Sequence, residues 1–362
     1  AKTFNFNGSH IGSLSADGIS VKGNVFLSGV KAKGEVRLLG AKIGGQLDCE
    51  NAEFVNEEGY AFSADGISVK GDMFLRGVKA KGEVRLLGAN IGGQLSCKDA
   101  EFVNKEGYAF NATSAIINEL LLWETKFKGR LSLSRAKVKV LADDEQSRPD
   151  KGKLSIDGFE YEMFRLPKNE NAEKRLGWIR LMTESSFYAQ PYEQLAKVFK
   201  QMGHETDRKK ALYEKHEDLR KYGALSKKGK LWNRFLGVTI GHGYKTWRLL
   251  LWIIPIILLG AGLFCYADNL EVMQPSKERV YLDPDFKRTG VLPERYSRFN
   301  AFIYSIDAFF PFVDLHQEGY YLPDSTRQHG NRFRYYLWLH IFSGWVFSTL
   351  AMAAFTGIVR RE

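Results

Sequence analysis

Apolar and polar side chains alternate over positions 1–160 of the chain in blocks of similar length. A glycine stands near the centre of each block, at regular 11-residue intervals: Gly23, Gly34 and Gly45, then Gly71, Gly82 and Gly93. Alternation with period two buries one face and leaves the other in water, which is strand geometry. We therefore expect units of about nine extended residues joined by two-residue corners. The apolar positions of the first three units are Ile19, Val21, Val25, Leu27, Val30, Ala32, Val36, Leu38, Ala41, Ile43, Leu47 and Cys49.

The units belong to a longer, 48-residue repeat, in which 14–62 and 62–110 are nearly identical in sequence. Three units of 11 and one of 15 make up each repeat, and the longer unit carries an extruded loop at 56–59 or 104–107. Short strands with fixed corners predict a right-handed parallel β-helix, a β-solenoid with about two units per coil, over residues 1–160. A β-sandwich is the alternative, and the fidelity of the 11-residue period favours the solenoid. The central glycine is expected to mark a bend in the wall.

Two further expectations concern this repeat. Phe4 and Phe6 already occupy mid-repeat positions, so more solenoid is expected before residue 1. Cys49 and Cys97 occupy equivalent inward positions and are interpreted as small core residues.

Residues 165–235 are expected to form a helical hairpin and a basic linker. Apolar residues at helical spacing predict one helix from about Pro191 to Gly203, and a second from about Thr206 to Tyr222. Between Arg208 and Arg234 there are ten Lys or Arg against three acidic residues. A nucleic-acid surface is one interpretation, but no array of stacking aromatics interleaves with this charge. Because an apolar run follows, the basic stretch predicts contact with anionic lipid headgroups.

Residues 236–362 contain two uncharged runs, 249–267 and 335–359. The first is long enough to cross a hydrocarbon core, and four of the seven tryptophans lie in or beside the two runs. We expect two membrane spans, with two buried helices of a soluble domain as the alternative. The segment from Asp268 to Arg334 holds nine basic and ten acidic residues, so positive charge gathers on the other side of both spans. Both termini are therefore expected in the cytoplasm, with a headgroup patch of Lys227, Lys228, Lys230, Arg234, Lys245 and Arg248.

A third apolar stretch, 299–313, is too short and too polar to cross, and it predicts a re-entrant helix. Span, re-entrant helix, loop, span is the layout of two-helix ion-channel pores, which this region resembles. The pore candidates are Asp307, Pro311, Phe312, Val313, Asp314 and Glu318. Asp307 is expected to face a neighbouring helix or a water path, and Asp314 and Glu318 to form acidic rings. The alternative assigns these last two residues to an exterior loop, where they would cap backbone groups or pair with Arg327 and Arg332.

The C-terminal half also resembles a bacterial family of membrane proteins joined to pentapeptide-like or bactofilin-like repeats. The resemblance rests on a Pro-Phe-Val-Asp-Leu-x-Gln segment, Pro311 to Gln317, before a last span that contains Gly344-Trp345. Some members carry the label of membrane-associated oxidoreductase, but this chain lacks the residue groups of such chemistry. It has no dinucleotide fingerprint, Cys-x-x-Cys pair, Walker loop or metal-spaced histidine cluster. His316 and His329 share a polar loop with acidic residues, and a solvated loop is the preferred interpretation over a metal site.

Composition agrees with a folded protein of several parts: 362 residues, 44% of them hydrophobic, a formal charge of +10 and three cysteines. We expect a homo-oligomeric channel of the bacterial inner membrane, most simply a cation-conducting tetramer, with the solenoid as sensor or assembly module. A membrane-anchored, bactofilin-like scaffold without conduction is the alternative. No catalytic activity, cofactor, metal or nucleic-acid partner is predicted, and the expected partners are anionic lipid, further copies of the chain and a cytoplasmic protein.

Overall fold

The computed structural model describes residues 2–165, 171–182 and 187–358. It divides into two compact units, Ala1–Leu225 and Ser226–Glu362. The first boundary of the sequence analysis, between solenoid and linker, falls inside the first unit, and the second, at 235/236, lies ten residues beyond the division found here.

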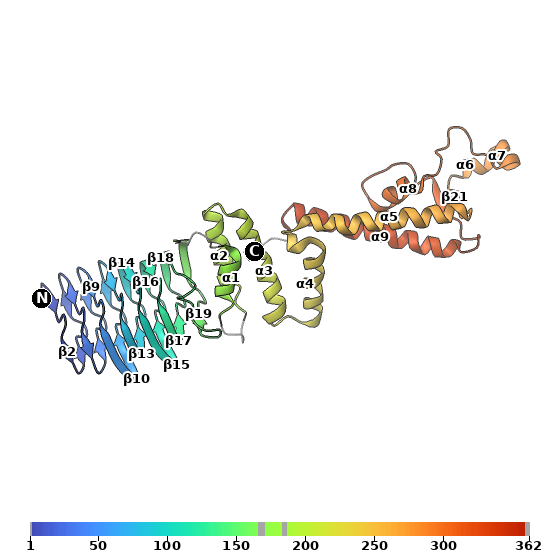
Figure 1. Cartoon of the computed structure of the whole chain (residues 1–362). Coiled ribbons are helices and arrows are strands. Elements are labelled where there is room, and N and C mark those ends of the chain that lie inside the picture. The colour runs from blue at the N-terminus through green and yellow to red at the C-terminus, as the bar shows by residue number, and fades with distance from the viewer. Residues whose placement is uncertain (1, 166–170, 183–186, 359–362) are drawn as a thin grey trace. The chain divides into compact units, whose positions relative to one another are not determined.

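The first unit begins with a parallel β-solenoid (Figure 1). Its early strands are two-residue segments: β1 (Phe4–Asn5), β2 (His10–Ile11), β3 (Leu14–Ser15), β4 (Ser20–Val21), β5 (Val25–Phe26), β6 (Lys31–Ala32), β7 (Val36–Arg37), β8 (Lys42–Ile43) and β9 (Leu47–Asp48). The strands that follow are β10 (Glu53–Ser63), β11 (Ser68–Val69), β12 (Met73–Phe74), β13 (Lys79–Arg85), β14 (Asn90–Ser96), β15 (Glu101–Asn111), β16 (Ile116–Leu121), β17 (Lys126–Ser132), β18 (Lys137–Ala142), β19 (Leu154–Ser155) and β20 (Glu160–Phe164).

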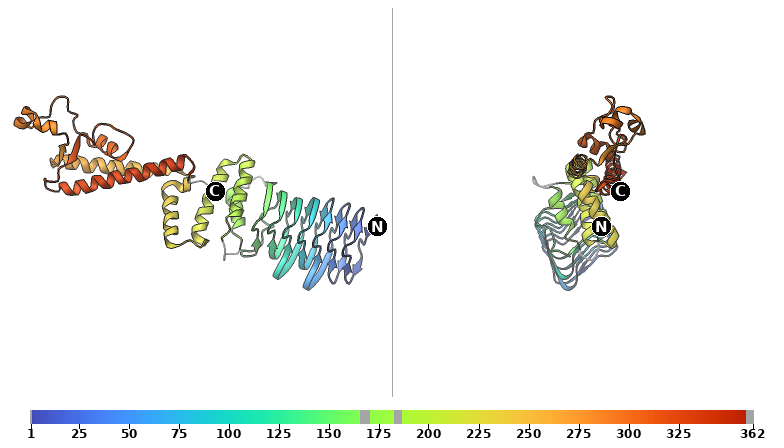
Figure 2. Two further views of the ribbon diagram at one scale, coloured as in Figure 1. Left: turned by 180° about the vertical axis from the view of Figure 1, so that it is seen from behind. Right: turned by 90° about the vertical axis from the view of Figure 1, so that its right-hand side faces the viewer.

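Two parallel sheets form the walls, and one of them stacks β1, β5, β9, β12, β14, β16, β18 and β20 in that order. Val25 pairs with Leu47, which pairs with Met73, so a 22-residue coil is followed by a 26-residue coil. Together they account for the 48-residue sequence repeat. Seen from the end in Figure 2 (right), the coils lie behind one another along the stack. The solenoid with two units per coil is thus confirmed, while its handedness stays a prediction.

The alternation of buried and exposed side chains is confirmed as well. Val21, Val25, Leu27 and Val36 are all at most 1% exposed, and Cys49 and Cys97 are fully buried in the core. The expected strand length of about nine residues is not observed among the described solenoid strands: β13, β14, β16, β17 and β18 have six or seven residues, β10 and β15 have 11, and the others have five or two. In the earlier coils the chain bends at the central glycine and divides each unit into two short strands.

Two kinds of glycine have different tasks in the coil. At the corners Gly29 and Gly40 adopt φ angles of +65° and +60°, and the Val30 N–H closes the turn on the Leu27 carbonyl oxygen at 3.2 Å. Asn51 takes the same left-handed conformation at a corner without glycine. The central Gly34 has ordinary φ, but a Cβ there would lie 2.8 Å from the Gly12 carbonyl oxygen. The central glycines therefore permit close approach of the preceding coil, and this is the physical reason for their 11-residue spacing.

Three helices follow the last coil: α1 (Ala172–Ile179) and α2 (Gln190–Gln201), which pack on its end, and α3 (Glu205–Tyr222), which packs on both of them. The last two match the predicted hairpin. Arg175 of α1, which is 1% exposed, pairs with Asp143 at 2.7 Å and lies 4.5 Å above the ring of Phe164. Gln194 of α2 donates a hydrogen bond to the carbonyl oxygen of Tyr161 in β20. The helices thus satisfy and shield the end of the stack, as a solenoid cap must.

The second unit contains α4 (Lys227–Ile240), η1 (Gly241–Gly243), η2 (Thr246–Leu249), α5 (Leu250–Asn269), α6 (Glu278–Leu282), α7 (Pro284–Thr289), α8 (Ala301–Phe309) and α9 (Gly330–Phe355). Strands β21 (Met273–Pro275) and β22 (Tyr321–Pro323) pair antiparallel. Helices α5, α8 and α9 pack on one another, with Phe264 and Tyr304 in edge-on contact within their shared core.

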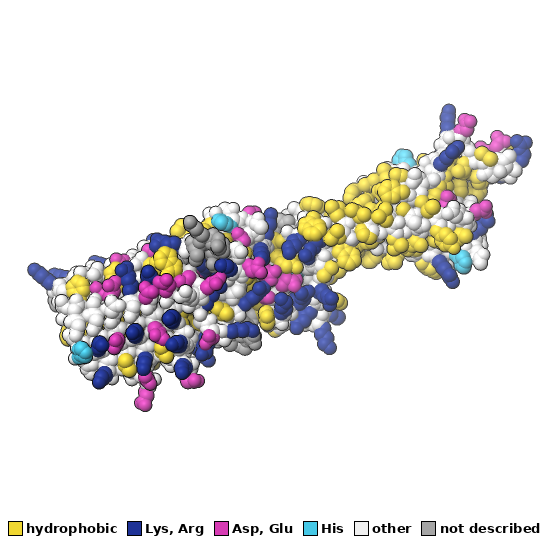
Figure 3. Space-filling model, in the orientation of Figure 1, with side chains coloured by type: hydrophobic (Ala, Val, Ile, Leu, Met, Phe, Trp, Pro, Cys, Tyr) yellow, Lys and Arg dark blue, Asp and Glu magenta, His cyan; other side chains and the backbone are white. Residues whose placement is uncertain are grey.

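Two helices of this unit, Thr246–Asn269 and Gly330–Phe355, are long and apolar enough to cross a membrane. They correspond to the expected spans 249–267 and 335–359, although the second begins earlier and ends at Phe355, and residue 359 lies outside the described residues. Only 22% and 33% of their most apolar windows are buried, and Figure 3 shows hydrophobic side chains over the visible face of α5 and α9. This surface needs a covering other than water, which fits association with a membrane.

A first prediction tests the inward face of the solenoid. Val36→Asp places a carboxylate in a fully buried position without a partner, and we expect a loss of about 4 kcal/mol or more in unfolding free energy. Lys33→Asp, on the exposed side of the same coil, is the control and should change stability by less than about 0.5 kcal/mol. Denaturant unfolding of the full chain followed by β-sheet circular dichroism measures both. Equal stability of the two variants would contradict the assignment of faces.

Candidate functional site

Helix α8, which falls within the segment 299–313, packs against both long apolar helices. Asn300 caps it, because its Oδ1 accepts the N–H groups of Phe302 and Ile303, both at 3.1 Å. Glycines on both neighbours allow the close packing. A Cβ at Gly260 of α5 would collide with the Ser305 hydroxyl, and one at Gly344 of α9 would collide with the Phe309 carbonyl oxygen. Gly260 on α5 and Gly344 on α9 thus each leave room for an atom of α8 that a Cβ would exclude.

The carboxylate of Asp307 holds the loop that follows α8, residues 311–318. Its Oδ1 accepts the Leu315 N–H at 2.7 Å, and its Oδ2 accepts the N–H groups of Gln317 and Glu318, both at 2.8 Å. The side chain is 8% exposed. Where the sequence analysis expects Asp307 to face a neighbouring helix or a water path, the structure turns it toward its own loop. Because it accepts three charge-assisted hydrogen bonds from backbone N–H groups, the Asp307 carboxylate stabilises the conformation of this loop.

Gln317 fastens the same loop to the other end of α8. Its Nε2 donates to the Ser297 hydroxyl at 2.8 Å and to the Arg298 carbonyl at 3.1 Å, while its Oε1 accepts the Asn300 N–H at 3.0 Å. The loop is therefore tied to both ends of a nine-residue helix. Asp314 and Gln317 of the segment from Pro311 to Gln317 therefore have different roles. Gln317 forms hydrogen bonds within the fold, whereas Asp314 lies at the surface.

Five of the six pore candidates line one open pocket of about 300 Å³, between the loop and helix α9. They are Asp307, Pro311, Val313, Asp314 and Glu318, joined by Ile341 and Trp345 of α9. Phe312 is not among the lining residues, and its side chain is 70% exposed. Five of the candidate residues thus lie together around one hollow, while both oxygens of Asp307 accept backbone N–H groups of the loop.

Asp314 and His316 are hydrogen-bonded to each other at the surface of this loop. Asp314 Oδ1 lies 2.7 Å from His316 Nδ1 and also accepts the His316 N–H. The hydrogen bond from His316 lowers the pKa of the Asp314 carboxyl, and the same contact raises the pKa of the imidazole. Within the described residues, Asp314 is not paired with Arg327 or Arg332, whereas Arg327 lies 3.6 Å from Glu271.

A polar cluster that sequence reasoning missed lies beneath Gly260. Ser305 Oγ donates to the Ile257 carbonyl at 2.8 Å, and His340 Nε2 lies 3.0 Å from the Ser305 carbonyl oxygen. His340 is 1% exposed, with the Tyr336 hydroxyl 3.4 Å from its other ring nitrogen. A carbonyl oxygen can only accept, so Nε2 carries a proton in this contact, and the ring bridges α8 and α9. The available signal was that His340 is the one side chain in the second apolar run whose ordinary pKa lies near neutral pH.

The basic residues assigned to lipid headgroups lie at the start of this unit. Lys227, Lys228, Lys230 and Arg234 are exposed on α4, whereas Lys245 and Arg248 are partly buried in the turn before α5. Arg248 Nη1 donates to the Gly237 carbonyl at 2.9 Å, which joins the turn to α4. Four of the six predicted residues are therefore presented at the surface, and Arg248 also has a structural contact.

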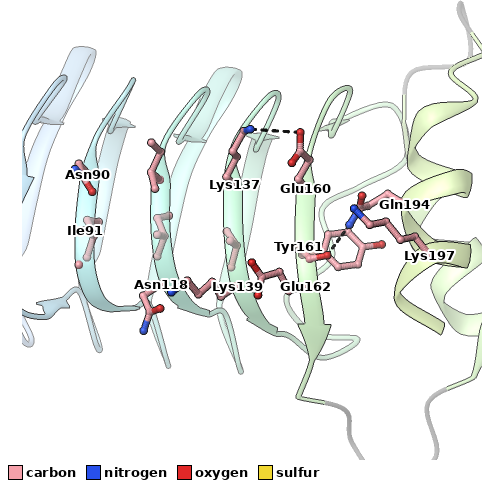
Figure 4. Close-up of a pocket in the computed structure, with 14 residues that line it drawn as sticks. Asn90, Ile91, Asn118, Lys137, Lys139, Glu160, Tyr161, Glu162, Gln194 and Lys197 are labelled. Carbon is pink, nitrogen blue, oxygen red and sulfur yellow. Dashed lines mark hydrogen bonds and ion pairs between the residues drawn. The ribbon is translucent and has the colours of Figure 1, made fainter. Parts of the chain in front are cut away.

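The first unit carries a separate hollow of about 380 Å³ beside the solenoid cap (Figure 4). Successive coils line it with Asn90, Lys137 and Glu160, and the side chains of Lys137 and Glu160 form an ion pair at 3.6 Å. Gln194 of α2 lines the end next to the cap. These contacts join neighbouring coils to each other and to the cap, so they stabilise the solenoid. In the described part of the chain, no group of three or more His, Cys, Asp and Glu side chains could hold a metal ion.

No protein-family model matches the chain, and neither a curated protein nor a solved structure shows significant similarity to it.

A second prediction tests the role of Asp307. Asp307→Asn turns one acceptor oxygen into a donor and removes the charge, so at least one of the three backbone bonds is lost. We expect local stability of the loop to fall by about 3 kcal/mol, equivalent to about 100-fold faster exchange of the Leu315, Gln317 and Glu318 amide hydrogens. Hydrogen–deuterium exchange with mass spectrometry measures it. Asp314→Asn, at an exposed carboxylate of the same loop, is the control, and identical exchange in both variants would reject the assignment.

Proposed function

We propose that this chain is the subunit of an oligomeric membrane channel that conducts cations. The observation that carries the proposal is the packing of α8 against both α5 and α9, with loop 311–318 folded back along it by Asp307. Helix α8 has nine residues, about half of what a span requires. A short helix and an irregular loop at membrane depth are tolerated where protein satisfies their backbone groups, as Asp307 does here.

The charges around the loop support cation conduction. The carboxylates of Asp314 and Glu318 lie at the pocket next to the C-terminal end of α8, whose dipole is negative there. Repeated by symmetry around an axis, they would form acidic rings that raise the local cation concentration. Two spans and one short helix cannot enclose a water path alone, so the proposal includes an oligomer, most simply a tetramer.

The proposed location is a bacterial inner membrane, with the first unit in the cytoplasm. The support is the asymmetry of basic residues, which gather before α5, while the segment between the spans is near neutral. In this arrangement the solenoid would be a sensor or assembly module, available to a cytoplasmic protein partner. The layout agrees with the bacterial family that the sequence resembles.

A membrane-anchored scaffold is the second candidate, and the contacts of Asp307 favour it. This carboxylate is occupied by the fold, so the membrane unit would be stable as a rigid anchor without a water path. In that case the regular coil stack would be the functional part, and Asp314 would only contribute to a surface loop.

A third prediction distinguishes these candidates by conductance. Purified full-length protein in planar bilayers should give discrete currents with cation-biased reversal potentials. Asp314→Asn and Glu318→Gln should each lower the cation conductance about two- to tenfold at low salt and less at high salt, because their charge is screened. Asp285→Asn, an equal charge change at an exposed α7 carboxylate outside the pocket, is the matched control. Absence of currents at every voltage and tension would reject the channel and leave the scaffold.

A fourth prediction tests orientation. In a Cys265→Ser background, which removes the exposed native thiol, Lys277→Cys should react with an impermeant thiol reagent in intact cells. Ala224→Cys should react only after the cells are opened. Both positions are exposed, so a lack of reaction reports the membrane and not burial. Labelling of Ala224→Cys alone in intact cells would invert the topology.

A further inference from the structure

Helix α4 has three distinct longitudinal stripes. Asn233, Gly237 and Ile240, at i, i+4 and i+7, are buried against the rest of the unit. A second stripe of the same spacing is apolar and unburied, and consists of Leu231, Phe235 and Val238, with Trp232 stacked on Phe235 at 5.5 Å. Leu231 is 71% and Trp232 59% exposed. Side chains of this type in water are costly, and they lie together on one side of one helix.

The third stripe is basic. Lys227, Lys230 and Arg234 follow one another at i, i+3 and i+7 beside the apolar stripe, and all three are exposed. None of them has an ion-pair partner within the residues that the structure describes. Figure 3 shows Lys and Arg side chains over α4, next to the apolar surface of α5 and α9. An apolar stripe flanked by unpaired cations is the pattern of a helix that lies in a membrane interface.

The direction of α4 fits such an interface. Gly241, His242 and Gly243 all have left-handed φ angles, of +57°, +54° and +81°, so the chain turns sharply between α4 and η2. As a result α4 runs across the end of the α5–α9 pair instead of continuing it (Figures 1 and 2). A helix that crosses the end of two membrane-spanning helices lies parallel to the membrane plane.

The residues that follow the turn are apolar and exposed as well. Trp247 of η2 and Leu250 and Leu251 of α5 are 56–61% exposed. Along the chain they stand between the apolar stripe of α4 and the rest of the first span. One solvent, the acyl boundary of a bilayer, would cover both surfaces.

We propose that α4 is an in-plane helix that embeds Leu231, Trp232, Phe235 and Val238 at the acyl boundary of an anionic leaflet, while Lys227, Lys230 and Arg234 bind its headgroup phosphates. The inference rests on the proposed membrane insertion of α5 and α9, and adds a second and separate contact with the lipid. This arrangement would couple the lipid to the first span. A change in lipid charge or lateral packing would shift α4, and the hydrogen bond from Arg248 to the Gly237 carbonyl would transmit that shift to the start of α5.

Site-directed spin labelling of the full chain tests the proposal. Single cysteines replace Leu231, Lys230 and Ile254 in a Cys265→Ser background, and each protein is reconstituted into nanodiscs with or without phosphatidylglycerol. All three positions are exposed, so labels there disturb the fold little. Accessibility to oxygen reports lipid, and accessibility to a water-soluble nickel chelate reports water. Ile254 is the control for the span itself.

The expected result is a lipid signature at 231 and an aqueous signature at the adjacent 230, with the lipid signature at 231 stronger in anionic discs. Lys227→Gln, Lys230→Gln and Arg234→Gln together, with the label at 231, should remove that dependence on lipid charge. A lipid signature at 254 with an aqueous one at 231 would overturn this inference alone. A label at 231 shielded from both reagents would show a protein contact instead and overturn it too. An aqueous signature at 254 would reject the proposed membrane insertion as well.

Discussion

Every backbone N–H and C=O that leaves water must find a partner, and both units of this protein are arranged by that requirement. In the solenoid the partner is the next coil: the Val25 N–H bonds to the Gln46 carbonyl, and the Leu47 N–H to that of Asp72, both at 2.9 Å. In the second unit no neighbouring strand is available to loop 311–318, and the carboxylate of Asp307 replaces it. The need to satisfy backbone hydrogen bonds is therefore met by regular pairing between coils in the first unit, and by one buried carboxylate in the second.

Glycine is the means by which these backbone groups approach each other. The central glycines of the solenoid admit the preceding coil, and Gly260 and Gly344 admit helix α8. A methyl group at any of these positions would meet a carbonyl oxygen, a hydroxyl or a side-chain oxygen from the neighbouring element. This explains why glycine recurs at 11-residue intervals in the first unit and at isolated positions in the apolar helices of the second.

The second unit combines an apolar surface with an uneven distribution of charge. The faces of α5 and α9 are largely unburied, carboxylates surround the pocket at one end of α8, and cations stand on α4. A bilayer with an anionic cytoplasmic leaflet offers a matching environment for the apolar surface and for the cations. The carboxylates, by contrast, have no group of opposite charge or polarity in the acyl region of such a bilayer. They are the basis of the proposed cation path.

The sequence by itself determined the solenoid, its 22- and 26-residue coils, the hairpin of the cap and the two long apolar helices, because each follows from a periodic pattern that local geometry enforces. It also grouped Asp307, Asp314 and Glu318, which are close along the chain. The tertiary structure alone decided what each does, since only the fold brings the Glu318 N–H to the Asp307 carboxylate. Two further features depend on non-local packing: the bridge between Ser305 and His340, and the sharp turn that sets α4 across the end of α5 and α9. Contacts of this kind leave no periodic pattern in the sequence, so they could not be predicted from it.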